Sequence, residues 1–339
     1  MQTHDMQEDR DLLVVGLGPA GAAAAAVAAQ GGLRVLGIDR KARLGHPAFP
    51  GGGEPRLGWI SSRWLGSGKS DGAGTFVNRM DFDRSLVEMA REAGAEIQLE
   101  TEILELVPAT NTARLRSVAT GEDREIHFRV LVAADGPHST VAECLALRPL
   151  EVRETRQYAL PLARPRRQIQ VLFAPGHPDV HAWLLPNGDD RASLAVAHEA
   201  GSGSEGQKLL DHLHMHLQLL GQVGQRVLRR IGGLMPVGGL RERLVAGSIL
   251  FAGDAAGLAH PITGMGVHAA VASGEAAANA CLAALAGRGQ LADYEAAIRQ
   301  GFGPALAEGA SLRERIRGDA ARPPACDQGE WQVAAELPL

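Results

Sequence analysis

The apolar positions near the start of the chain form two short runs separated by a helical pattern. Residues 12–15 are apolar, too few and too branched for a helix, and they predict a strand buried in a parallel sheet. Alanine fills most of residues 22–29, which predicts a helix directly behind this strand. Residues 34–38, which are apolar after Arg34, predict a second parallel strand that ends at the acid Asp39. This order predicts a βαβ unit with parallel strands.

Two further apolar runs predict buried strands of the same sheet. Residues 130–134 precede Asp135, and residues 248–252 precede Gly253 and Asp254. Between them the pattern changes to shorter runs of strand type and one amphipathic stretch. The runs in this middle part are residues 169–173, 181–185 and 192–197, and the amphipathic stretch is residues 206–230. Helices are also expected over residues 81–93, from the turn after Asp254 to residue 286, and over residues 291–317.

The patterns predict an α/β fold with two interleaved parts. A Rossmann-type domain takes residues 10–150 and 236–315, and a smaller, mainly β (α+β) substrate domain takes residues 151–235. Glycine-rich residues 46–74 have no periodicity and are expected to form a loop that contributes to the active-site cleft. Residues 1–10 are predicted to be a disordered leader, and residues 319–339 a flexible tail.

Composition excludes several classes of protein. Hydrophobic residues make up 45% of the 339 positions, enough for a sizeable core, and a net charge of −5 with scattered arginines argues against nucleic-acid binding. The three cysteines lie far apart, which favours a reducing cytoplasm. The polar N-terminus is not a signal peptide, and no segment has the length of a membrane span. The composition leaves peripheral contact with a membrane open, and the expected partner is a small-molecule substrate.

No metal site is predicted. His212, His214 and His216 lie close together in the sequence, but only the first and the last share a helical face, and no acid or cysteine completes a set of ligands. A solvated helix face is the better interpretation of these three residues.

The turn after the first strand carries Gly16-x-Gly18-x-x-Gly21. In this pattern the first glycine permits a tight turn, the second lets a pyrophosphate approach the backbone, and the third allows close packing of helix and strand. The N-terminus of the following helix offers free N–H groups to the phosphates. Asp39 has the spacing expected of a carboxylate that accepts a ribose hydroxyl. The motif therefore predicts a dinucleotide site, formed by Gly16, Gly18, Pro19, Ala20, Gly21, Asp39 and Arg40.

A second glycine-rich site lies far along the chain. Asp254 at the end of its strand could hold a polyol hydroxyl, and the helix N-terminus after residue 266 offers donors for the charge of a reduced isoalloxazine. A nicotinamide dehydrogenase does not need this second site, whereas an extended FAD explains both. Since the single glycine turn is then occupied by FAD, NAD(P)H is expected only as a transient reductant, or a carrier protein takes its place. The predicted residues at this end are Gly253, Asp254, Pro261, Gly264, Met265 and Gly266.

Several further motifs resemble those of known flavoproteins. The glycine turn, residues 77–79 before a helix with Asp83, residues 134–139, and residues 253–266 are together similar to the hydroxybenzoate-hydroxylase-type flavoprotein superfamily. Residues 178–186 resemble the substrate-sheet motif of its geranylgeranyl reductases, and the resemblance covers roughly residues 10–315. It implies that Arg79 contacts the cofactor and that Asp135 orients its pyrophosphate side.

Two departures from the reductase pattern bear on the substrate. The family's loop carries a cysteine before a glycine–glutamate pair, and the matching residues 49–54 have none. The family's tyrosine and phenylalanine in the sheet motif are His181 and Leu185 here. With a substrate domain of only about 85 residues, a smaller or differently shaped substrate than a long polyprenyl chain is plausible.

The candidates for the pocket are His46, His181, Trp183 and His260, because an imidazole can relay a proton and a tryptophan can line a substrate site. The predicted function is an FAD-dependent oxidoreductase that reduces a carbon–carbon double bond by hydride transfer at the flavin. The alternatives are a monooxygenase or halogenase-like enzyme using NAD(P)H and oxygen, and an inactive flavin-binding accessory protein, which the missing cysteine keeps open.

Overall fold

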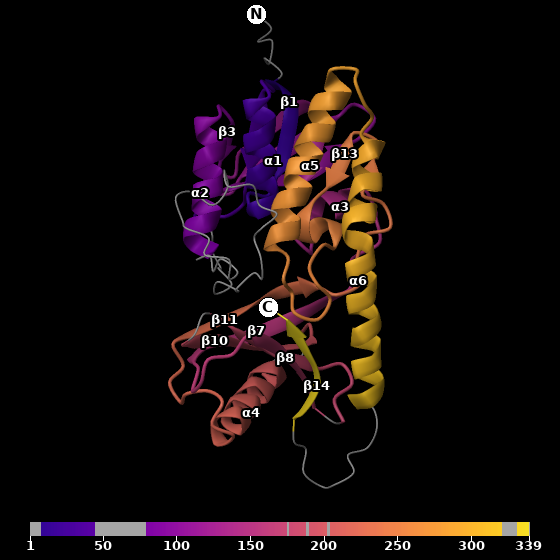
Figure 1. The fold of residues 1–339 in the computed structure, drawn as a ribbon. Coiled ribbons are helices and arrows are strands. Elements are labelled where there is room, and N and C mark those ends of the chain that lie inside the picture. Colours follow the sequence, from indigo (N-terminus) through magenta and orange to yellow (C-terminus); the bar gives the residue numbers. More distant parts are fainter. Residues whose placement is uncertain are drawn as a thin grey trace, which may run out of the picture.

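The fold consists of two sheets, one above the other in Figure 1, with helices around them. The computed structural model describes residues 8–44, 79–174, 176–187, 190–201, 204–320 and 331–338. The predicted fold class, a Rossmann-type α/β domain with a smaller mainly β domain, is confirmed.

The first sheet has a parallel core. β1 (Glu8–Val15) lies between β2 (Val35–Ile38) and β6 (Asp123–Ala133), and β6 continues to β13 (Ile249–Phe251). Leu12 to Val15 pair on both sides and are almost fully buried, as expected of an apolar central strand. The remaining strands are β3 (Glu96–Gln98), β4 (Thr101–Val107), β5 (Thr112–Ser117) and β12 (Val245–Ala246).

Helix α1 (Pro19–Gln30) is packed on every side. It lies between α2 (Arg79–Glu92) and α5 (Val267–Leu285), as Figure 1 shows. Its alanines are buried because small side chains let neighbouring backbones approach closely: a Cβ on Gly274 of α5 would lie 2.0 Å from the carbonyl oxygen of Ala20. The alanine run therefore serves close packing, which fixes the position of the turn before α1.

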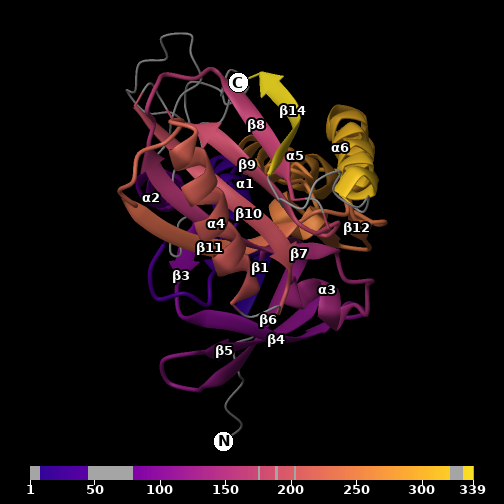
Figure 2. The same ribbon diagram turned by 90° about the horizontal axis from the view of Figure 1, so that it is seen from below.

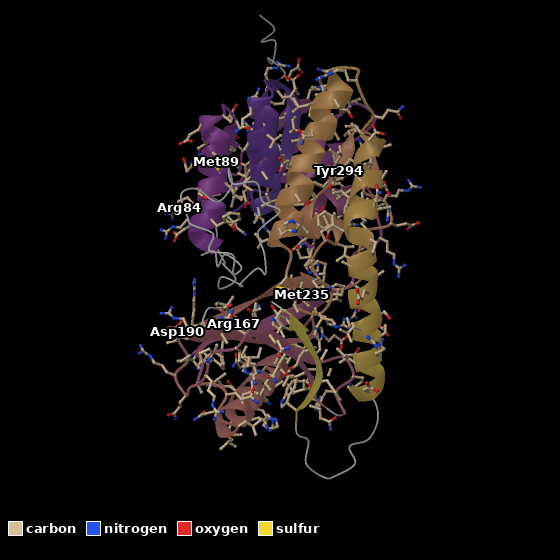
Figure 3. All side chains as sticks on the ribbon, viewed as in Figure 1. Arg84, Met89, Arg167, Asp190, Met235 and Tyr294 are labelled. Carbon is tan, nitrogen blue, oxygen red and sulfur yellow. The ribbon has the colours of Figure 1, made fainter. Side chains whose placement is uncertain are left out.

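The second sheet is antiparallel, in the order β11-β7-β10-β9-β8-β14. Helix α4 (Glu205–Leu219) covers one of its faces through a core that includes Tyr158, Leu184 and Leu213 (Figure 2). The opposite face, with Trp183 and Met235, is turned toward the first sheet, and Figure 3 shows Met235 at this boundary. The strands are β7 (Val152–Pro161), β8 (Gln168–Phe173), β9 (His181–Pro186), β10 (Arg191–Glu199), β11 (Arg229–Pro236) and β14 (Gln332–Pro338).

Helix α6 (Ala292–Ala320) runs along both sheets (Figure 1). Near its start, the Tyr294 hydroxyl donates to the carbonyl of Phe251 at 2.6 Å. Toward its end, the buried Arg313 donates to the carbonyl of Val237 at 3.0 Å and pairs with Glu151. One helix therefore fixes the position of the substrate sheet relative to the first domain.

Several boundaries differ from those predicted. The leader prediction is wrong for Glu8 to Arg10, which belong to β1. The flexible-tail prediction is wrong for residues 332–338, which pair with β8 at the edge of the second sheet. The helical stretch predicted over residues 206–230 ends at Leu219, and no strand was predicted over β7 or β11. No helix in the described part of the chain is long and apolar enough to cross a membrane.

Candidate functional site

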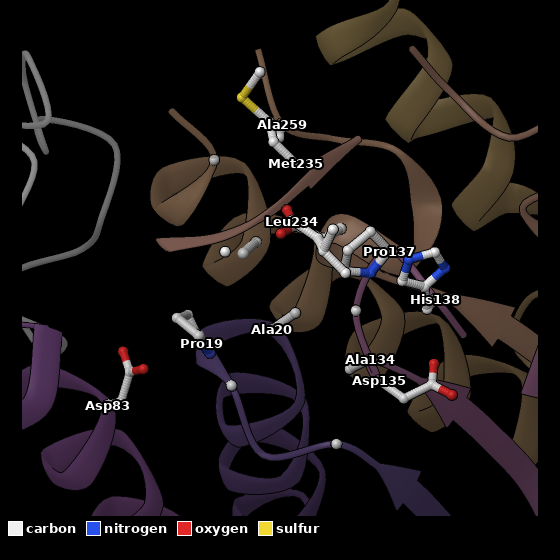
Figure 4. Close-up of a pocket in the computed structure, with 18 of the residues that line it drawn as sticks. Pro19, Ala20, Asp83, Ala134, Asp135, Pro137, His138, Leu234, Met235 and Ala259 are labelled. Atoms are coloured by element: carbon white, nitrogen blue, oxygen red, sulfur yellow. The ribbon is translucent and has the colours of Figure 1, made fainter. Parts of the chain in front are cut away.

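A cavity of about 720 Å³ lies between the two sheets and contains most of the residues predicted for the site. Its volume is within the usual range for sites of small molecules and cofactors. Figure 4 shows its walls, with Pro19 and Ala20 at the start of α1, Asp135 after β6, and Leu234 and Met235 of the substrate sheet. The predicted residues that line it are Gly16, Gly18, Pro19, Ala20, Asp39, Arg40, Asp135, Trp183, Gly253, Asp254, Gly264, Met265 and Gly266.

The three glycines of the first turn have different surroundings. A Cβ on Gly21 would lie 1.8 Å from the carbonyl oxygen of Gly16, and one on Gly16, which has a φ of +92°, would lie 2.4 Å from that of Ala134. At both positions, neighbouring backbone atoms leave no space for a side chain. A Cβ on Gly18 would meet nothing within 4 Å, although Gly18 lines the cavity. The turn therefore leaves open, at its second glycine, the space in which a ligand can contact the protein backbone.

Asp39 at the end of β2 fixes the geometry of the same turn. One carboxylate oxygen accepts the N–H of Leu17 and the other accepts that of Lys41, both at 2.9 Å. Each oxygen keeps a further lone pair for a hydroxyl in the cavity. Asp39 is therefore both a support for the glycine turn and a possible acceptor for a ligand.

Asp135 lies where β6 leads into α3 (Thr140–Cys144). One of its oxygens accepts the N–H of Val141 at 3.1 Å, while the other is buried with no partner among the described residues. Burial raises the pKa of Asp135, and hydrogen bonds from Ser139 and from the amide of Val141 counteract this effect. A buried carboxylate oxygen without a partner is costly, so a donor from a ligand or a water molecule is expected here.

The far end of the cavity is formed by the turn after β13 and by the loop before α5. Gly253, with a φ of +60°, begins a 3-10 turn (Gly253–Ala256) that presents Asp254 to the cavity. The buried guanidinium of Arg241 holds this turn by donating to the carbonyl of Ala255 at 2.9 Å. A Cβ on Gly264 would lie 2.5 Å from the sulfur of Met235, so this loop touches the substrate sheet directly.

The structure does not bring every candidate to the cavity. His181 is buried beneath the loop before α5, where its Nε2 lies 3.0 Å from the carbonyl of Ile262, and it packs against Trp183 at a ring distance of 5.9 Å. His260 accepts the amide of Thr263 through Nδ1 at 3.3 Å, and burial lowers its pKa. Neither these two histidines nor Gly21 and Pro261 line the cavity. His46 and residues 46–74 lie outside the described residues, and so does the side chain of Arg79, whose backbone begins α2.

His181 should make the stability of the protein depend on pH. Burial lowers the pKa of its imidazole to about 4. The nearby charges of Arg313 and Arg153 lower this pKa further, and the hydrogen bond to Ile262 raises it in part. Because the unfolded chain then binds the proton more readily below pH 6.5, the free energy of unfolding falls with falling pH, by about 2 kcal/mol from this residue at pH 5.

We expect His181→Gln to lose this part of the pH dependence in denaturant unfolding curves measured between pH 5 and 8. The exposed His212→Asn is the matched control and should retain the wild-type slope. Parallel curves for the wild type and His181→Gln would contradict a neutral, buried imidazole.

Sequence reasoning missed the polar part of the substrate wall. Thr155 and Gln157 of β7 and Ser193 of β10 line the cavity and are at most 7% exposed. For Thr155 and Gln157 the signal is the strand alternation of residues 152–161, which places them on one face. Ser193 of β10 pairs with Ala159 and lies on the same face.

Comparisons with known proteins agree with this geometry. The model of an FAD binding domain matches residues 69–198. A digeranylgeranylglycerophospholipid reductase of Methanothermobacter thermautotrophicus is 29% identical over 350 residues, covering 92% of this chain and 87% of the relative. A second such reductase, of Methanopyrus kandleri, is 31% identical over 302 residues, covering 79% of this chain and 75% of the relative. The chain belongs to the digeranylgeranylglycerophospholipid reductase family.

Solved structures of the same fold extend beyond this family. A geranylgeranyl bacteriochlorophyll reductase-like protein of Thermoplasma acidophilum has a TM-score of 0.76 and 22% identity, covering 92% of this chain and 88% of its own. The flavin-dependent brominase Bmp2, as a triple mutant, has a TM-score of 0.68 and 19% identity, covering 91% and 88%. The protein is thus a member of the reductase family and an FAD-dependent oxidoreductase, as predicted.

Proposed function

We propose that this family member reduces carbon–carbon double bonds of an isoprenoid or similarly apolar substrate. The observation that carries the proposal is the continuity of the cavity, which joins the glycine turn of α1 to a wall of the substrate sheet formed by Trp183, Leu185, Leu234 and Met235. A cofactor extended between the two domains would present one end to this apolar wall. The relatives' names, which specify digeranylgeranylglycerophospholipid, indicate the class of molecule to test first.

The described residues fit an extended FAD. The open space at Gly18 and the N-terminus of α1 would hold the pyrophosphate, and Asp39 would accept a ribose hydroxyl. At the other end Asp254 would accept a ribityl hydroxyl, and the N–H groups at the start of α5 would hold the flavin end. FAD supplies the hydride when it is bound and reduced, and the protein supplies orientation and electrostatics.

The residues of the substrate wall bind and orient the substrate. No side chain that the second sheet contributes to the cavity, within the described residues, is ionisable. The proton that completes the reduction would therefore come from water or from an acid on the opposite side of the cavity, and not from this sheet. The apolar side chains hold the reacting bond against the cofactor and keep most other water away.

The reductant is a separate question, since the chain has a single Gly-x-Gly-x-x-Gly turn. If FAD occupies this turn, NAD(P)H can only visit, or a carrier protein delivers the electrons. A crystal structure with a nicotinamide dinucleotide on residues 16–21 would contradict this assignment.

The test of the function uses the FAD-loaded protein, reduced by dithionite without oxygen. Mixing with a digeranylgeranylglycerophospholipid or with geraniol should reoxidise the flavin in step with loss of one double bond, measured by absorbance and mass spectrometry. Oxidised or halogenated product formed only when oxygen is admitted would favour the monooxygenase or halogenase alternative. Absence of any product under both conditions would refute the reductase proposal.

A further inference from the structure

The face of the substrate sheet toward the cavity carries a polar side chain, Gln157, and an aromatic side chain, Trp183, on two strands with one strand between them. In the strand register, Ala195 of β10 pairs with Gln157 of β7 on one side and with Trp183 of β9 on the other. Since neighbouring strands lie about 4.8 Å apart, the backbones of Gln157 and Trp183 are separated by about 10 Å across the alanine. Gln157 and Trp183 line the cavity, whereas Ala195 between them is fully buried and does not. This part of the substrate wall therefore has one polar side and one aromatic side.

Gln157 is the polar group of this part of the wall that has no partner among the described residues. It is only 7% exposed and lines the cavity, yet its amide makes no hydrogen bond to any described residue. Its neighbours differ: the Thr155 hydroxyl donates to the carbonyl of Gly233 at 3.2 Å, and the Ser193 hydroxyl accepts from the amide of Asn187 at 2.7 Å. Because the Gln157 side chain lines the cavity and its amide has no protein partner among the described residues, the amide is available to pair with a ligand group there.

The charges around the cavity define what that group can be. Charged lining residues such as Asp39, Arg40 and Asp254 belong to the first sheet and its loops. The described part of the substrate wall has none, and an ionised group placed there would be buried without a counter-charge. A primary amide can donate to a carbonyl or hydroxyl oxygen and accept from a hydroxyl. The group opposite Gln157 is therefore an uncharged oxygen function.

We propose that Gln157 binds a hydroxyl or carbonyl group of the substrate, and that the part of the substrate against this wall is an unsaturated, uncharged chain bearing that oxygen. The apolar side of the chain faces Trp183, and its polar end faces Gln157. This assignment rests on the proposed function for the location of the substrate, and it adds the chemical class of the group that is recognised.

Three probes with one carbon skeleton test the assignment by calorimetric titration of the FAD-loaded, oxidised protein. They are geraniol, the hydrocarbon 2,6-dimethyl-2,6-octadiene, and geranyl diphosphate. We expect geraniol to bind about tenfold more tightly than the hydrocarbon, the effect of one hydrogen bond to a buried amide, and the diphosphate to bind most weakly. In Gln157→Leu the affinities for geraniol and for the hydrocarbon should become nearly equal, with the hydrocarbon's affinity retained.

The control variant is Gln168→Leu, at the exposed start of β8 outside the cavity, which should keep the wild-type ratio. Retained binding of the hydrocarbon shows that Gln157→Leu is folded, and Gln157→Met serves if the leucine variant does not fold. The assignment is overturned if Gln157→Leu keeps the wild-type ratio of geraniol affinity to hydrocarbon affinity, or if it loses FAD and not geraniol affinity. It is also overturned if the wild type binds the diphosphate most tightly or does not bind geraniol. Because no turnover is needed, binding as expected without reduction of any probe would refute the reductase function alone.

Discussion

Replacing Gly18 with valine should lower the affinity for FAD by on the order of a hundredfold or more, without lowering the melting temperature of the FAD-free protein. The side chain would enter the only part of the glycine turn that the described protein leaves open, since a Cβ at Gly18 meets nothing within 4 Å. That space is where a pyrophosphate must approach the backbone. The valine methyl groups would therefore block the ligand without clashing with the described protein. Gly18 has a φ of −71°, which valine adopts without strain.

Gly21→Ala should have the opposite pattern and damage the fold itself. Its Cβ would lie 1.8 Å from the carbonyl oxygen of Gly16, so β1 and α1 must move apart. Overpacking of this kind costs about 1–3 kcal/mol and more where backbone is in the way. The FAD-free variant should therefore melt at a clearly lower temperature than the wild type.

The measurements are thermal melts of the FAD-free proteins and fluorescence titrations with FAD. Gly301→Val is the matched control, because Gly301 lies on α6, also has nothing within 4 Å of its Cβ position and does not line the cavity. It should change FAD affinity little. If Gly18→Val bound FAD with wild-type affinity, the proposal that the dinucleotide binds at this turn would be wrong.

The parts of the fold that follow local rules could be predicted from the sequence. An apolar strand, a glycine turn and an alanine helix are each determined by neighbours in the chain, and β1, α1 and β2 are found where the pattern predicts them. The carboxyl ends of parallel strands meet at one edge of a sheet, so Asp39 and Asp135 could be expected at the same edge, and the resemblance to known flavoproteins assigned both to one ligand. The structure places both around one cavity.

Three strands of the second sheet were not predicted from the sequence, either because function or close packing sets their residue types or because their partners lie far along the chain. β7 does not show apolar alternation because its cavity-facing side chains, Thr155 and Gln157, are polar. β11 contains Gly232, where a Cβ would lie 3.0 Å from the carbonyl oxygen of Thr155, so close approach of the backbone favours a residue type that usually weakens strands. β14 pairs with β8 from about 160 residues away, and no local pattern specifies such a partner.

Most of the residues predicted for the cofactor line the cavity, whereas fewer of the candidates for the substrate pocket do. Backbone turns that approach phosphates require glycine, which is visible in a sequence, whereas the covering of His181 by the loop at Ile262 depends on tertiary packing. Strand alternation correctly places His181 and Trp183 on one face, but only Trp183 lines the cavity. A face shared in one strand does not decide which of its residues another loop covers.

Asp39→Ala and Asp254→Ala should impair the enzyme in different ways. Asp39 accepts the N–H groups of Leu17 and Lys41, and in the proposed complex also a ribose hydroxyl, so its loss weakens the ADP end of the site. A hydrogen bond to a charged group contributes about 1.5–3 kcal/mol, which corresponds to roughly ten- to a hundredfold in FAD affinity. Saturating FAD should then restore most of the turnover of Asp39→Ala.

Asp254→Ala should not be rescued by FAD. The ADP end still binds in this variant, but the ribityl chain loses the acceptor that the turn held by Arg241 presents to the cavity. A misplacement of about 1 Å at the reacting atoms can lower the rate on the order of a hundredfold, and saturation with a cofactor does not correct geometry. Turnover at increasing FAD, with FAD affinity measured separately, distinguishes the two variants. If added FAD rescued both equally, or if neither substitution weakened binding or turnover, the extended cofactor could not lie between Asp39 and Asp254.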